Sequence, residues 1–106
     1  MSAYIRLIYD RIEFLEFKQS ILFLKQPQHK AAIFEELSLE CFLQIRDFTK
    51  SISEKILAGE KYTFEEYEKE LFLLWPPIKS YPSSSALVAK ALMDNEVYNS
   101  LFSYSN

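Results

Sequence analysis

The chain contains a single glycine, Gly59, among its 106 residues. Globular proteins usually carry about 7 % glycine. Tight hairpins and glycine-rich phosphate loops need residues that reach positive φ, and this chain has few of them. The sequence therefore predicts an all-α fold. We expect a small bundle of four main helices plus a short C-terminal helix, forming one domain over residues 1–106.

The first helix is predicted near residues 3–25. Its apolar residues are separated mainly by three or four positions, as in an amphipathic helix: Ile5, Ile8, Ile12, Leu15, Ile21, Leu22 and Leu24. Ser2 is the expected N-cap, and Pro27 ends the pattern because the residue before a proline avoids the helical conformation. Ser20 is a candidate position for a bend.

A second helix is predicted from about residue 29 to residue 58. Its apolar stripe has helical spacing and is expected to face the core: Phe34, Leu37, Cys41, Ile45, Phe48, Ile52 and Ile56. Within this stripe, Cys41 is predicted to be a buried and inert thiol. Gly59 is well placed to end the helix in a left-handed conformation.

The third helix is predicted to begin with a capping box in the sequence TFEE. Thr63 would cap the backbone amide of Glu66, and the Glu66 carboxylate would reach back to Thr63. Pro76 and Pro77 are expected to end this helix. A fourth helix should start after Ser84 or Ser85, and Asp94 should cap a short final helix.

The residue types that carry catalysis are scarce. His29 is the only histidine and Cys41 the only cysteine, so the sequence holds no disulfide and no cluster with metal-ligand spacing. One glycine cannot build a phosphate loop. We therefore expect a protein that is not an enzyme and binds no cofactor or metal. The lone cysteine, with no recognisable signal peptide or membrane span, favours the cytoplasm.

The acidic charge is concentrated in the middle third of the chain. Residues 35–70 contain ten Asp and Glu residues against five Lys and Arg residues. An acidic region repels nucleic acid and attracts basic protein surfaces. The pattern argues against contact with nucleic acid and indicates a protein partner.

Several carboxylates and leucines are predicted to share the outer faces of the second and third helices. Exposed leucines among carboxylates are typical of a site for a basic partner, although an ordinary solvated helix face has the same composition. The candidate partner-binding residues are Glu36, Glu40, Leu43, Asp47 and Glu54 on the second helix, and Glu65, Glu66, Glu70 and Leu73 on the third.

Residues 53–104 resemble colicin D-type immunity proteins and related immunity proteins of contact-dependent inhibition systems. The resemblance is carried by ILAGEKYTFEEYEKELFLLW, which is followed by a loop, and by LVAKALMDNEVYNSLF. Its elements are a turn from Leu57 to Glu60, a capped helix that starts at Thr63, and a late pair of Asp94 and Tyr98. Lys61 and Tyr62 make the turn longer than in that pattern.

This resemblance implies a bacterial immunity protein that binds a basic toxin nuclease domain and blocks its active site with an acidic surface. The alternative is a self-associating structural or regulatory module without catalytic activity, such as a homodimeric helical bundle. A third option is an adaptor subunit of an enzyme. Charge-steered binding weakens as ionic strength rises, whereas apolar self-association does not, so salt dependence separates the first two functions.

Overall fold

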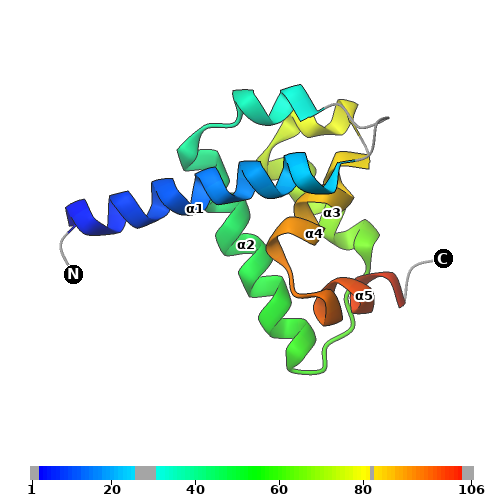
Figure 1. Cartoon of the computed structure of the whole chain (residues 1–106). Helices are drawn as coiled ribbons and strands as arrows, with labels where there is room; N and C mark the ends of the chain where they lie inside the picture. The colour runs from blue at the N-terminus through cyan, green and yellow to red at the C-terminus, as the bar shows by residue number, and fades with distance from the viewer. Residues whose placement is uncertain (1–2, 26–30, 82, 104–106) are drawn as a thin grey trace.

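A computed structural model describes residues 3–25, 31–81 and 83–103, and within these ranges it contains helices and no strand (Figure 1). The all-α prediction is therefore confirmed. The five α-helices are α1 (Ala3–Leu24), α2 (Leu39–Leu57), α3 (Phe64–Leu74), α4 (Ser83–Leu92) and α5 (Asn95–Ser103). Two short 3-10 helices, η1 (Ala31–Glu36) and η2 (Pro76–Ser80), precede α2 and α4.

Helix α1 runs without a break through Ser20, so the bend considered there does not occur. Its predicted cap Ser2 and its predicted stop Pro27 lie outside the described residues. The buried face of α1 consists of Phe14, Phe17 and Ile21. The residues whose spacing predicts the helix, from Ile5 to Leu15, are largely exposed to solvent, because the N-terminal half of α1 extends beyond the other helices (Figure 1).

The prediction of one helix over residues 29–58 is wrong. The chain forms η1, leaves helical geometry at Leu37 and Ser38, and starts α2 at Leu39. Ser38 has extended backbone, and its hydroxyl accepts a hydrogen bond of 3.1 Å from the amide of Cys41. Ser38 is thus the N-cap of α2, and it satisfies one of the amides that a helix start leaves without a partner.

Gly59 ends α2 in the predicted way. It has a φ of +96°, which is the left-handed conformation that glycine adopts most cheaply. The Gly59 amide donates to the Ile56 carbonyl and the Glu60 amide donates to the Lys55 carbonyl, both at 3.0 Å. These two bonds form a Schellman motif.

The capping box of α3 is also confirmed. The Thr63 hydroxyl accepts from the Glu66 amide at 3.1 Å, and the Thr63 amide donates to the Glu66 carboxylate at 3.2 Å. Helix α3 ends before Pro76, as predicted. Helix α4 begins at Ser83, slightly earlier than expected, and α5 begins directly after Asp94.

One hydrophobic core joins all five α-helices. Aromatic rings connect its parts: Phe14 of α1 stacks on Phe42 of α2 with ring centroids 4.9 Å apart, and Phe34 lies 5.4 Å from Trp75. The predicted stripe of α2 is buried or half-buried, but the stripe omits Phe42, which is fully buried. Helix α1 therefore packs on a side of α2 that the sequence prediction leaves to solvent.

Cys41 packs against the core but is half-buried, so it is less buried than predicted. Its Sγ atom lies 3.6 Å from the carbonyl oxygen of Leu74 in α3, a distance that allows the thiol to donate a weak hydrogen bond. Burial raises the pKa of the Cys41 thiol, which favours the less reactive protonated form.

Candidate functional site

Glu40, Asp47 and Glu54 lie along one exposed side of α2, as their spacing of seven residues predicts. Glu36 does not belong to this line. It is exposed, but it lies in η1, and the break at Leu37 and Ser38 separates it from α2. The structure therefore keeps three of the four carboxylates on one helix face.

The leucines predicted to anchor a partner beside this line are less exposed than expected. Leu43 and its neighbour Leu39 are half-buried and pack against the hydrophobic core. They contribute to the internal packing of α2 and offer a partner only part of their side chains.

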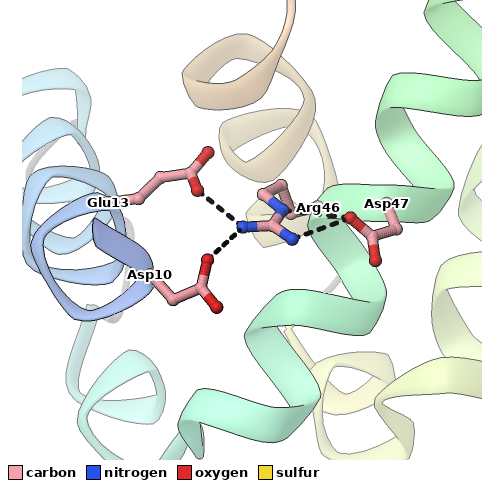
Figure 2. Close-up of polar contacts among 4 residues, drawn as sticks. All are labelled: Asp10, Glu13, Arg46 and Asp47. Carbon is pink, nitrogen blue, oxygen red and sulfur yellow. Dashed lines mark hydrogen bonds and ion pairs between the residues drawn. The ribbon is translucent and has the colours of Figure 1, made fainter. Parts of the chain in front are cut away.

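Asp47 takes part in an ion-pair cluster centred on Arg46 (Figure 2). The Arg46 guanidinium lies 2.7 Å from the Glu13 carboxylate and 3.0 Å from each of the carboxylates of Asp10 and Asp47. Burial lowers the pKa of Arg46. The hydrogen bonds with the three carboxylates raise this pKa by a larger amount, so the net shift is upward. The cluster fastens α1 to α2.

Sequence reasoning missed this cluster because its partners are distant in the chain. Asp10 and Glu13 are three residues apart and share one face of α1. Arg46 is the only arginine after Arg11. No pattern of neighbouring residues in the sequence indicates that Arg46 contacts Asp10 and Glu13.

The carboxylates of α3 are arranged as predicted. Glu65, Glu66 and Glu70 are exposed on the side of α3 away from the core, and Leu73 among them is 72 % exposed. At about 100° per residue, Glu66, Glu70 and Leu73 fall within roughly 60° of one another. Glu66 and Glu70 therefore share a narrow arc with Leu73, Glu65 lies about 80° from Leu73 around the helix, and Glu66 also serves the cap of α3.

Tyr62 lies just before α3, and the pKa of its phenol is raised above the ordinary value. Partial burial raises the pKa of its phenol, and the charges of Glu66 and Glu70 raise it further. Among the described residues, no ion pair involves Glu65, Glu66 or Glu70. The negative charge at the start of α3 is therefore less compensated than that of Asp47.

A mixed-charge cleft with a volume of about 480 Å³ lies where α1, α2 and α5 meet. Arg46, Lys50 and Asp94 contribute charged groups to its wall. Its serine, Ser53, donates its hydroxyl proton to the Thr49 carbonyl at 2.9 Å, and the described residues that line the cleft include no histidine. This lining provides no nucleophile with a paired base.

The part of the chain that the structure describes contains no group of three or more residues suited to hold a metal ion. His29 lies outside that part. No described helix is both long and apolar enough to cross a lipid bilayer.

Comparison with known proteins gives no match: no protein-family model, no curated protein and no solved structure is significantly similar to this chain.

Proposed function

We propose that the protein is an immunity protein: an inhibitor that binds the basic active site of a bacterial toxin nuclease through the outer face of α3. The observation that carries this proposal is the group of exposed carboxylates Glu65, Glu66 and Glu70 near the exposed side chain of Leu73; none of these carboxylates forms an ion pair among the described residues. A nuclease site that holds phosphates is lined by Lys and Arg, so it complements this face in charge.

The α3 face is a better candidate than the acidic line of α2. On α2, Asp47 already binds Arg46, and Leu43 is half-buried in the protein's own core. On α3, Glu65, Glu66 and Glu70 form no ion pair among the described residues; the pKa of Tyr62 is raised first by partial burial and then by the charges of Glu66 and Glu70. A basic partner would gain more from the uncompensated face.

The mechanism involves no chemical step by this protein. The α3 carboxylates would take the places of substrate phosphates against lysine and arginine side chains of the toxin, while Leu73 would exclude water from the centre of the contact. A charged pair at the centre becomes desolvated, so removal of one carboxylate leaves an unpaired buried cation. Such a removal costs roughly 2–5 kcal/mol of binding free energy.

The experiment compares two matched double variants in bacteria that express the toxin gene adjacent to the gene of this protein. The test variant is Glu65→Lys with Glu70→Lys on α3. The control is Glu40→Lys with Glu54→Lys on α2, which changes the charge equally and also reverses one carboxylate in the first turn of its helix. Glu66 is left unchanged because it closes the capping box.

We expect the α3 variant to lose protection against the toxin and the α2 control to keep it. Unfolding of both purified variants by urea should show similar stability, since each loses one favourable contact with a helix N-terminus, worth about 0.3–1 kcal/mol. Full protection by both variants would disprove inhibition through an acidic face. Loss of protection by the α2 control alone would place the inhibitory surface on α2.

A further inference from the structure

Helix α1 carries two apolar stripes on opposite sides. One stripe, formed by Phe14, Phe17 and Ile21, is buried against the rest of the molecule. The other, which we name the α1 seam, is exposed and consists of Ile5, Ile8, Ile12, Leu15 and Leu22. At about 100° per residue, the centres of the two stripes lie nearly opposite each other. The core of the molecule therefore accounts for only one of them.

The exposure of the α1 seam is substantial. Ile8, Ile12 and Leu15 keep 41 %, 46 % and 61 % of their surface in solvent. Figure 1 shows the N-terminal half of α1 projecting past the other helices, so this part of the seam is accessible along its length. A continuous row of exposed Ile and Leu side chains is typical of an interaction surface.

The spacing of the seam is that of a coiled coil. Its residues follow one another by three and four positions, with Gln19 occupying the remaining place before Leu22. In heptad notation, Ile5, Ile12 and Gln19 take the a positions, and Ile8, Leu15 and Leu22 take the d positions. Three heptads fill the length of α1, which is about 33 Å at 1.5 Å per residue.

We propose that the α1 seam pairs with the α1 seam of a second copy of this chain to form a parallel, two-stranded coiled coil. Isoleucine at a, with leucine at two of the three d positions, favours two parallel strands. A single polar residue at an a position, here Gln19, fixes the register of such a pair.

The charges beside the seam select the parallel arrangement. Arg11 takes a g position and Glu16 the e position of the next heptad, and both are exposed. In a parallel pair, Arg11 of one copy faces Glu16 of the other, and the two-fold axis creates this contact twice. In an antiparallel pair aligned over the whole seam, Arg11 would face Lys18, a repulsive contact.

The body of the molecule leaves Ile5 to Leu15 of the seam exposed, and α4 and η1 border the seam only at its C-terminal end, beside Gln19 and Leu22. The buried stripe occupies the c and f positions of the same heptads, so the other helices pack on the side of α1 opposite the seam. A hollow of about 560 Å³ lined by Glu16, Gln19, Phe23 and Lys90 separates the C-terminal end of the seam from α4.

The test is sedimentation equilibrium of the full chain over a range of concentrations. We expect an average mass that rises with concentration from 12.5 kDa for the monomer towards twice that value. A mass of 12.5 kDa at every concentration would overturn the proposal, and a mass that approaches three chains would overturn the two-stranded arrangement.

Two glutamate substitutions with similar exposure locate the contact. Ile12→Glu changes an a position of the seam, whereas Leu7→Glu changes a c position; the wild-type side chains are 46 % and 41 % exposed. Ile12→Glu should weaken dimerisation by at least tenfold, and Leu7→Glu should leave it nearly unchanged. Equal effects of the two substitutions would show that the seam is not the contact.

Charge reversal tests the direction of the helices. Arg11→Glu and Glu16→Arg should each weaken the dimer about three- to tenfold, and the double variant should restore it, because the pair is rebuilt with opposite signs. A stronger dimer with Arg11→Glu alone would instead indicate the antiparallel arrangement, in which position 11 faces Lys18. These outcomes are independent of the α3 face, since Glu65→Lys with Glu70→Lys should leave the dimer intact.

Discussion

At the residue scale, the hydrogen bond between Thr49 and Tyr67 is the main polar contact inside the core. Their hydroxyl oxygens lie 2.8 Å apart, and both side chains are buried. Burial raises the pKa of the Tyr67 phenol well above its ordinary value, although the bond with Thr49 lowers it in part. The phenol therefore remains protonated and needs a hydrogen-bonding partner.

We predict that Thr49→Val lowers the free energy of unfolding by about 1–3 kcal/mol, because it leaves the Tyr67 hydroxyl buried without a partner. Adding Tyr67→Phe should recover most of that loss, since no polar group then remains unsatisfied. Urea unfolding of both single variants and the double variant measures the coupling. Strictly additive effects would show that the two hydroxyl groups do not interact.

In contrast to Thr49 and Tyr67, Ser84 and Ser85 in the first turn of α4 have buried hydroxyl groups that make no hydrogen bond among the described residues. We predict that Ser85→Ala raises the stability by about 1 kcal/mol, because it removes an unsatisfied polar group and improves helix propensity. Thermal unfolding checks this, with the exposed Ser83→Ala as the control; a lower melting temperature for Ser85→Ala would contradict the prediction.

At the element scale, the start of α3 depends on the side chain of Thr63. We predict that Thr63→Ala lowers the stability by about 1 kcal/mol through loss of the cap, whereas Thr63→Ser, which keeps the hydroxyl group, costs much less. Chemical denaturation of the two variants distinguishes them. If both were as stable as the wild type, the capping box would contribute nothing to the fold.

The ends of α2 and α3 could be predicted because their signals are local. Gly59 and the TFEE sequence act through residues that are neighbours in the chain. The break at Leu37 and Ser38 was missed because apolar spacing continues across it: Phe34 and Leu37 are buried before the cap, and Ile45 is buried after it. The spacing of apolar residues indicates which side chains are buried. It does not show whether they belong to one helix or to two successive helices.

At the scale of the whole molecule, Arg46 connects α1 to α2. We predict that Arg46→Met, which keeps most of the apolar stem, lowers the stability by about 1–2 kcal/mol in low salt, because Asp10 and Glu13 lose the cation between them. The loss should shrink as ionic strength increases, since salt screens partly exposed charges. Unfolding at two salt concentrations measures this; a loss that does not depend on salt would mean that Arg46 acts through packing.

In the candidate site, too, the features that depend on one helix could be predicted, and those that depend on how helices pack could not. The exposure of Glu65, Glu70 and Leu73 follows from the period of one helix and could be predicted. The pairing of Arg46 with Asp10 depends on how α1 crosses α2. The exposure of the α1 seam similarly depends on which face of α1 the other helices cover. Both α1 stripes are apolar, so composition gives no way to choose between them.

Helix α1 makes its most extensive contacts with α4, near the other end of the chain, rather than with its neighbour α2. During synthesis, α1 is made long before residues 83–92 of α4 exist to pack against it. Phe14 and Phe17 can pack on Phe34 and Phe42 earlier, but the contacts of α1 with α4 form only when the chain closes a loop of about sixty residues. Until then the nascent chain exposes apolar surface of α1 that favours aggregation, and α5, which adds Val97 and Leu101 to the core, arrives later still.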